Sequence, residues 1–132
     1  MYRSTSLMAD TLGDSKSKYR VAVASTDGET VNTHFGKSHL FYIYFVDDET
    51  GYDLVEKRVV TPVCQDGSHV KSAMEESVKQ FADCKYVVAS RIGAGAAQSL
   101  TAAGIISMEL PGSIYDAILK VWKYNRVQGL FN

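Results

Sequence analysis

Short runs of apolar residues, separated by polar turns, predict five strands along the chain. Each run is rich in β-branched and aromatic residues and is bounded by turn residues, which is typical of strands. The predicted strands cover residues 19–24, 40–46, 52–61, 86–90 and 105–109.

Other apolar residues recur at the spacing of one helix face. This pattern predicts helices at residues 68–82 and 96–103, and a third helix that begins after Ser113. Gly104 stands where a glycine usually follows a helix. Ser113 is a good N-cap residue, with Asp116 three residues on.

The order β-β-β-α-β-α-β-α predicts an α/β fold. The strand at 40–46 is apolar on both faces, as in a strand that is covered on both sides. The strand at 52–61 carries several charges, which suits a sheet edge, and its short connection implies an antiparallel hairpin. A hairpin that leads into βαβαβ units with right-handed crossovers gives a mixed five-stranded sheet. This is the layout of an RNase H-like three-layer α/β/α sandwich.

The composition fits one domain, expected at residues 19–132 after a flexible tail at 1–18. Of the 132 residues, 45% are hydrophobic and 22% are charged, so the chain can bury a core. With 14 Lys and Arg against 15 Asp and Glu, it lacks the basic excess of proteins that bind nucleic acid or anionic membranes. We expect neither of these partners.

Compartment and redox state are also expectations from the sequence. No run approaches the roughly 18 apolar residues of a membrane-spanning helix. No basic segment followed by an apolar run opens the chain, so we expect no secretory signal. Two cysteines are too few for a disulfide scaffold. We therefore expect a cytoplasmic protein with free thiols, and we place Cys84 in the core.

Nuclease chemistry is excluded first, because metal-assisted phosphoryl transfer needs several converging carboxylates. The predicted strands at 19–24 and 86–90 carry none. Asp47 and Asp48 lie in a hairpin turn and are interpreted as solvated turn residues.

A glycine-rich turn from Gly93 to Gly95 separates a strand from a helix. Its backbone amides and the helix N-terminus could hold an anion, and Arg91 adds a cation. The turn is neither a dinucleotide fingerprint nor a P-loop, since Gln98 replaces the last glycine and no Gly-Lys-Ser/Thr follows. The simpler explanation for the turn alone is structural: a positive φ angle and close packing of helix on strand.

Soft metal ligands form the third group of candidates. They are His34, His39, Cys64 and His69, all in loops or at strand ends. Imidazole and thiolate suit iron, zinc and iron–sulfur clusters, although the spacing matches no closed zinc motif. The loops that carry His34, Cys64 and His69 could face the same end of the sheet as the glycine turn. We interpret His39 as structural, and the alternatives of a hydrogen-bonded loop histidine or a buried Cys64 stay open.

Several of these segments resemble one known family. Residues 21–28 and 31–38 read VAVASTDG and VNTHFGKS, and the aromatic strand at 41–44 reads FYIY. Together with the segments CQDGSH at 64–69 and RIGAG at 91–95, they resemble the dinitrogenase iron–molybdenum cofactor-binding family. The resemblance covers about residues 19–124, and the His-Phe-Gly loop after a Val-Ala-Val-Ala strand is its most specific part.

The resemblance implies a non-catalytic carrier with an RNase H-like fold. Such a carrier binds an iron–sulfur-based cluster transiently, for example the iron–molybdenum cofactor or its precursor, and passes it from a donor protein to an acceptor protein. The residues implied to contact the cluster are His34, Phe35, Gly36, Cys64, His69, Arg91, Gly93 and Gly95. Among these, His34 matches the family's histidine and is the implied principal metal ligand, with Cys64 and His69 as further ligands.

The chain departs from the family in two places. It lacks a Cys-x-x-x-Cys-x-x-Cys motif, so it is not the radical enzyme that builds the precursor. Ser68 stands before His69 where glycine is more usual. Two alternative functions stay open: a regulatory protein–protein module with an unused cluster site, and an enzyme that binds a small phosphorylated ligand at the glycine turn. The enzyme lacks a recognisable nucleophile–base pair.

Overall fold

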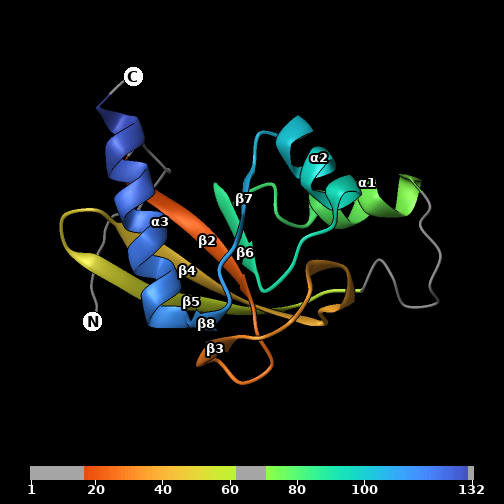
Figure 1. The fold of residues 1–132 in the computed structure, drawn as a ribbon, viewed down its shortest axis with the longest axis horizontal. Coiled ribbons are helices and arrows are strands. Elements are labelled where there is room, and N and C mark those ends of the chain that lie inside the picture. The colour runs from red at the N-terminus through yellow and green to blue at the C-terminus, as the bar shows by residue number, and fades with distance from the viewer. Residues whose placement is uncertain (1–16, 62–70, 131–132) are drawn as a thin grey trace.

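A computed structural model describes residues 17–61 and 71–130, in which one mixed sheet lies between two layers of helices (Figure 1). The sheet order is β5-β4-β2-β6-β7. Its strands are β2 (Lys18–Ala24), β4 (Leu40–Asp47), β5 (Gly51–Val59), β6 (Tyr86–Ala89) and β7 (Ile106–Glu109). The hairpin of β4 and β5 and the pair of β2 and β4 are antiparallel, whereas β6 pairs parallel with both β2 and β7. The α/β fold with a mixed five-stranded sheet and three helices is therefore confirmed.

The helices cover both faces of the sheet. They are α1 (Lys71–Lys79), α2 (Ala94–Ala102) and α3 (Ile114–Gly129). Figure 1 shows α1 and α2 next to each other, with α3 lying apart across the strands. In β2, Ala22 and Ala24 face the core under α1 and α2, while Val21 and Val23 face the core under α3. This alternation follows from the two-residue period of a strand.

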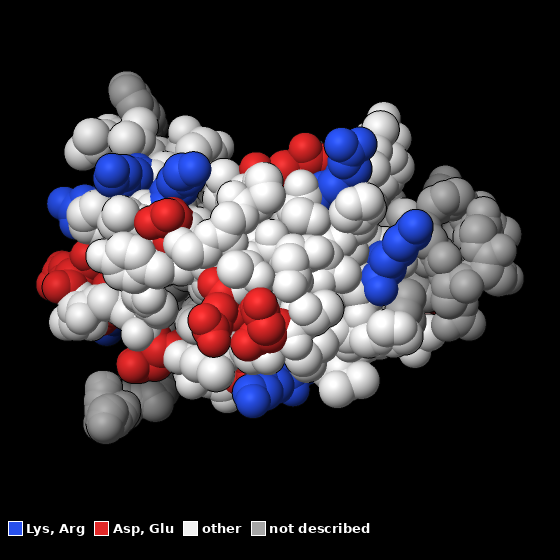
Figure 2. Space-filling view, turned by 60° about the horizontal axis from the view of Figure 1, so that its bottom comes forward, with Lys and Arg blue, Asp and Glu red and all other residues white. Residues whose placement is uncertain are grey.

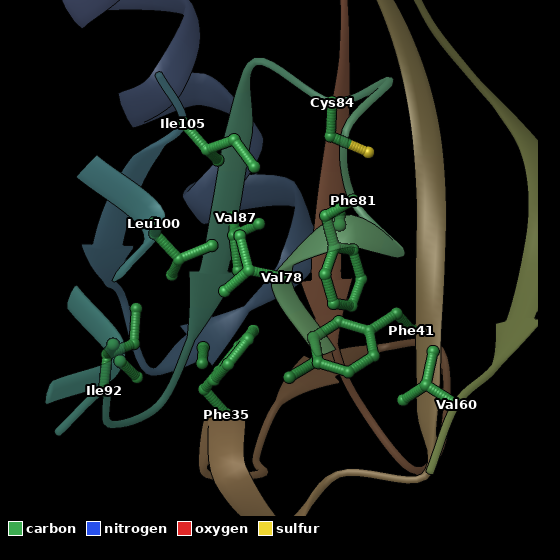
Figure 3. Close-up of a cluster of buried hydrophobic side chains, with 14 of the residues drawn as sticks. Phe35, Phe41, Val60, Val78, Phe81, Cys84, Val87, Ile92, Leu100 and Ile105 are labelled. Carbon is green, nitrogen blue, oxygen red and sulfur yellow. The ribbon is translucent and has the colours of Figure 1, made fainter. Parts of the chain in front are cut away.

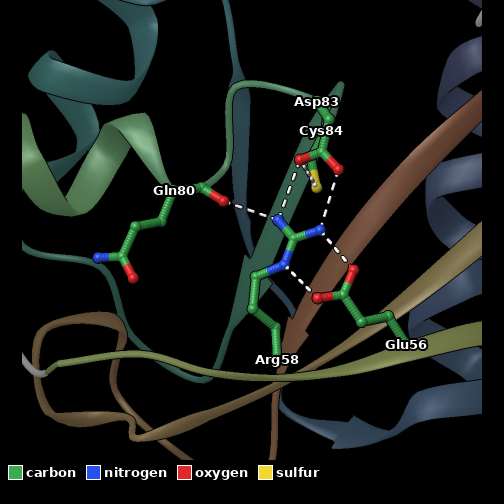
Figure 4. Close-up of polar contacts among 5 residues, drawn as sticks. All are labelled: Glu56, Arg58, Gln80, Asp83 and Cys84. Atoms are coloured by element: carbon green, nitrogen blue, oxygen red, sulfur yellow. Dashed lines mark hydrogen bonds and ion pairs between the residues drawn. The ribbon is translucent and has the colours of Figure 1, made fainter.

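The expected edge strand is β5, and most of its residues are exposed. The Arg58 side chain ties it to the turn after α1. The Arg58 guanidinium lies between two carboxylates, with Nη2 at 2.7 Å from Glu56 Oε1 and 2.9 Å from Asp83 Oδ2 (Figure 4). Arg58 also donates to the main-chain oxygen of Gln80 at 2.7 Å. The bonds to Asp83 and Gln80, from an Arg58 side chain that is only 16% exposed, fix the edge strand to the turn after α1. Glu56 lies on β5 itself and orients the guanidinium.

A polar network holds α3 at the end of the sheet where β2 begins. Asp48 accepts hydrogen bonds from the Tyr19 hydroxyl (2.8 Å) and the Asn125 amide (3.0 Å). Its main-chain oxygen accepts from the Trp122 indole at 2.9 Å. The Tyr86 hydroxyl donates to Asn125 Oδ1 at 2.7 Å. The interpretation of Asp48 as a merely solvated turn residue is thus wrong, because the turn carries its carboxylate back against α3.

Element boundaries differ modestly from those that the pattern predicts. The described part of α1 ends at Lys79 because residues 80–83 form a turn, and α2 begins at Ala94, two residues early. Gly104 has a φ of +82°, and the Ser113 hydroxyl accepts the main-chain N–H of Asp116 at 3.0 Å, so both helix-end predictions are confirmed.

The sequence pattern missed a small second sheet, in which β3 (Thr30–Val31) pairs antiparallel with β8 (Gly112–Ser113). Strands of two residues are too short to show a period. Within residues 17–61 and 71–130, no helix has the length and apolar character to span a membrane.

Candidate functional site

The loop that follows β2 is built by its own polar side chains. The Asp27 carboxylate accepts the main-chain N–H groups of Glu29 (2.8 Å) and Thr30 (2.9 Å), and these two bonds lower the pKa of Asp27 to about 2. Gly28 has a φ of +75°, and a Cβ there would lie 2.9 Å from the Tyr42 ring. Only glycine fits that position without strain. The Ser-Thr-Asp-Gly part of the family motif therefore shapes the loop that leads to His34.

Phe35 anchors the next part of this loop in the core. It belongs to a short 3-10 helix, η2 (Phe35–Lys37), and is 3% exposed. Its ring lies 5.8 Å from the rings of both Phe41 and Phe81, whose centroids are 4.6 Å apart (Figure 3). His34 precedes η2 and is exposed. The inward Phe35 thus holds the outward His34 in place, and the structure places Phe35 in the core rather than on the surface.

His34 and Arg91 come together although they are far apart in sequence. They form a parallel β-bridge, in which Phe35 N–H donates to the Arg91 carbonyl at 2.9 Å. Ser90 N–H donates to the Thr33 carbonyl at 3.0 Å. Both the His34 and the Arg91 side chains are exposed. The prediction that these two loops share one end of the sheet is confirmed.

The glycine turn continues directly from Arg91 into α2. Gly93 is the N-cap of α2, with a φ of −64° and no side-chain cap, and Ala97 N–H is bonded to its carbonyl at 2.9 Å. A Cβ added at Gly93 or Gly95 would meet no atom within 4 Å. The structural explanation of these glycines is therefore wrong: neither needs a positive φ or close packing. They leave exposed backbone at a helix N-terminus, where the first N–H groups have no intrahelical acceptor.

Glu109 is a residue that the sequence pattern did not single out. It ends β7, and its Oε2 accepts the main-chain N–H of Ile92 at 2.7 Å. Ile92 lies between Arg91 and Gly93, with its side chain in the core. The available signal was a carboxylate at the carboxyl end of a parallel strand, where sites in open α/β sheets form.

The remaining candidate ligands are Cys64, His69 and His39. Cys64 and His69 lie outside the described residues. His39 is exposed, and its carbonyl accepts Val60 N–H at 2.8 Å at the start of β4. Cys84 is a buried free thiol, and burial raises its pKa to about 12, which agrees with a core role. No three His, Cys, Asp or Glu side chains gather as a metal site within 17–61 and 71–130.

On the face shown in Figure 2, basic and acidic side chains form small groups among uncharged residues.

Two surface hollows, of about 610 and 310 Å³, lie along α3 beside Asp48 and Trp122, at the other end of the sheet from His34. The candidate site is thus an exposed surface that offers one imidazole, one guanidinium and a helix N-terminus. This set can ligate a metal and stabilise negative charge.

The chain is similar to known proteins over most of its length. The family model for the dinitrogenase iron–molybdenum cofactor matches residues 17–124. The chain is 36% identical over 104 residues to the FeMo cofactor biosynthesis protein NifB of Frankia alni, covering 76% of this chain and 19% of that protein. It is 33% identical over 99 residues to protein NifY of Klebsiella pneumoniae, covering 73% and 40%. The chain thus spans less than half the length of these relatives.

The fold has a counterpart among solved structures. The crystal structure of PH0822 aligns with a TM-score of 0.56 and 25% identity, over 79% of this chain and 88% of that one. Because the family model matches most of the described sequence, including the His34 loop and the glycine turn, the resemblance inferred from the motifs is confirmed. The chain belongs to the dinitrogenase iron–molybdenum cofactor family.

Proposed function

We propose that this chain is a non-catalytic carrier in cofactor biosynthesis for nitrogen fixation. Its cargo is an anionic iron–sulfur-based cluster, such as the iron–molybdenum cofactor or its precursor, held transiently on an RNase H-like fold. The observation that carries this proposal is the pairing of the His34 loop with Arg91, directly beside the open N-terminus of α2. Family membership and the names of the relatives support it.

The chemistry of these groups fits an anionic metal cluster. The exposed His34 imidazole is a ligand for iron or molybdenum, and Cys64 and His69 are further ligands under this proposal. The Arg91 guanidinium stabilises sulfide or carboxylate groups of the cargo by charge. The amides around Gly93 and Gly95 donate to the same negative charge at the helix N-terminus. Since a Cβ at either glycine would point into open space, the cargo can approach the backbone closely.

Exposure of the site suits a carrier. A cluster that is handed from a donor protein to an acceptor protein must be reached by both. His34 and Arg91 are both exposed, so a cluster held there is within reach of both proteins. This arrangement favours transfer over permanent retention.

The direct test is an anaerobic titration of the purified protein with isolated iron–molybdenum cofactor, followed by visible absorption. His39→Ala is the matched control for His34→Ala, because both histidines are exposed and lie in neighbouring segments. We expect saturable binding by the wild type and by His39→Ala. We expect His34→Ala to bind roughly tenfold or more weakly, the scale of losing one interaction of about 1.4 kcal/mol. Equal affinities in all three proteins would overturn the ligand assignment.

A second candidate function is a regulatory module that binds a partner protein. The observation in its favour is the apolar hollow between α3 and the β4–β5 turn, where Tyr115 is 62% and Tyr52 38% exposed. Capture of the same partner by metal-free and cluster-loaded protein would favour this module. Capture that depends on the loaded cluster would favour the carrier.

A further inference from the structure

The turn that carries Arg91 is held by a carboxylate from a neighbouring strand. Glu109 Oε2 accepts the Ile92 N–H at 2.7 Å. The parallel pairing of β6 with β7 ends at Ala89 and Glu109, and Leu110 N–H still donates to the Ala89 carbonyl at 3.0 Å. Beyond this point the main chain of β7 offers no partner to Ile92. The Glu109 side chain supplies the acceptor that the strand no longer provides.

Three contacts then fix the turn from three directions. The Ile92 side chain is buried in the core, its N–H is held by Glu109, and the Arg91 carbonyl is held by Phe35 N–H. Gly93 follows at once as the N-cap of α2. Hydrogen bonds to an ionised acceptor are shorter than neutral ones, and the 2.7 Å length of the Glu109 bond is typical of that kind.

We propose that Glu109 is a positioning residue for the cluster site. By holding Ile92 it keeps Arg91 and the N-terminus of α2 facing the same side as His34. The inference rests on the proposed function, because its main measurement is the binding of cargo.

The charge and the hydrogen bond of Glu109 act on binding in opposite directions. Its negative charge lies near a surface that attracts an anion, so the charge alone weakens binding. Its oxygen holds the turn, so the hydrogen bond strengthens binding. Glu109→Gln removes the charge and keeps an oxygen acceptor. Glu109→Ala removes both.

The two variants therefore separate the effects in the titration with isolated iron–molybdenum cofactor. We expect Glu109→Gln to bind at least as tightly as the wild type. We expect Glu109→Ala to bind roughly tenfold more weakly, which is the loss typical of replacing a residue that orients ligand groups by hydrogen bonding. Glu49→Ala, an exposed glutamate in the β4–β5 turn at the other end of the sheet, is the control for net charge. Binding by Glu109→Ala that is as tight as or tighter than that of the wild type, or weaker binding by Glu109→Gln, would overturn the positioning role.

Amide NMR tests the same idea without cargo. In Glu109→Ala we expect faster hydrogen exchange at Ile92 and shifted resonances of Gly93, Gly95 and His34, with near-normal values in Glu109→Gln. Shifts confined to Ile92 and residue 109 would contradict a positioning role for Glu109.

If the wild type fails to bind the cofactor, the proposed function is refuted, while the amide data still decide whether Glu109 positions the turn. If Glu109→Ala does not fold, Glu109→Asp decides, because it keeps the charge and draws the acceptor oxygen away from the Ile92 N–H. Weaker binding with displaced resonances at Gly93 and His34 supports the proposal, and wild-type affinity and spectra refute it.

Discussion

At the scale of single residues, the family motif combines two kinds of position. Asp27, Gly28 and Phe35 build and anchor the loop, while His34 and Arg91 face solvent. A residue of the first kind is expected to change stability when it is replaced. A residue of the second kind is expected to change binding and leave the fold intact. This distinction produces predictions that a sequence motif alone does not.

Phe35→Ala tests the anchor. Removing a buried aromatic ring from the Phe35, Phe41 and Phe81 cluster is expected to lower the free energy of unfolding by about 3–5 kcal/mol. Urea unfolding measures this loss. Val59→Ala is the control, because Val59 is 79% exposed and its truncation is expected to cost no more than about 0.5 kcal/mol. Unchanged stability in Phe35→Ala would show that the ring does not hold the loop.

Two glycine substitutions distinguish structural from functional glycines. Gly28→Ala is expected to destabilise the fold by about 1 kcal/mol or more, because of its positive φ and the contact with Tyr42. Gly95→Ala is expected to leave stability unchanged or raise it by up to about 1 kcal/mol, since Gly95 lies in α2 with open space around it. It is nevertheless expected to weaken cofactor binding. Thermal unfolding and the cofactor titration together decide the matter, and a strongly destabilised Gly95→Ala would refute this assignment.

The Asp27 carboxylate gives the loop a dependence on pH. Its pKa of about 2 in the folded protein lies below the ordinary value of 3.8. Its contribution to stability is therefore fully present above about pH 4 and is lost as the pH falls through about 2. Asp27→Asn is expected to be less stable at neutral pH and to lose less stability between pH 4 and pH 2. Urea unfolding at several pH values measures both slopes, and parallel slopes would contradict the assignment.

At the scale of elements, long regular patterns were predictable and short or distant pairings were not. The stripe of apolar residues after Ser113 predicted α3 and its cap because both depend on neighbours in sequence. The bridge between His34 and Arg91 depends on how two loops meet in space, so its register could not be predicted, although the shared end of the sheet could. The φ angle of Gly93 could not be predicted either. The interpretation that this turn needs a positive φ was wrong for that reason.

The edge strand β5 is attached to the turn after α1 by Arg58, through Asp83 and the Gln80 carbonyl. Arg58 also pairs with Glu56 of β5 itself, and it lowers the pKa of both carboxyl groups. Arg58→Ala is expected to lower the free energy of unfolding by about 1–2 kcal/mol. The loss is limited because the two partner carboxylates are half exposed and can be hydrated once Arg58 is removed. Hydrogen exchange should accelerate along β5 more than in β2. Lys79→Ala, at an exposed ion pair with Glu76, is the control with little expected effect. Uniform acceleration over the whole sheet would speak against a local clamp.

At the scale of the whole molecule, one end of the sheet carries a structural hydrogen-bond network and the other end carries the candidate site. At one end, Asp48, Asn125 and the aromatic hydroxyls lock α3 to the sheet. At the other end, the loops after β2 and β6 meet and expose His34 and Arg91. With a net charge of −1, the chain does not attract an anion through its overall charge. Under the proposed function, the attraction for an anionic cluster comes from these local groups.

Under the proposed function, His34 is the principal ligand of the bound cluster. Pulsed electron paramagnetic resonance of isolated iron–molybdenum cofactor, bound to protein with ¹⁵N-labelled histidine, tests this most directly. Because His69 is a further proposed ligand, every protein in this comparison carries His69→Ala. We expect a ¹⁵N coupling in this background and when His39→Ala is added, and its loss when His34→Ala is added. The same coupling after His34→Ala, or bound cofactor without any histidine coupling while His34 is present, would refute His34 as a ligand.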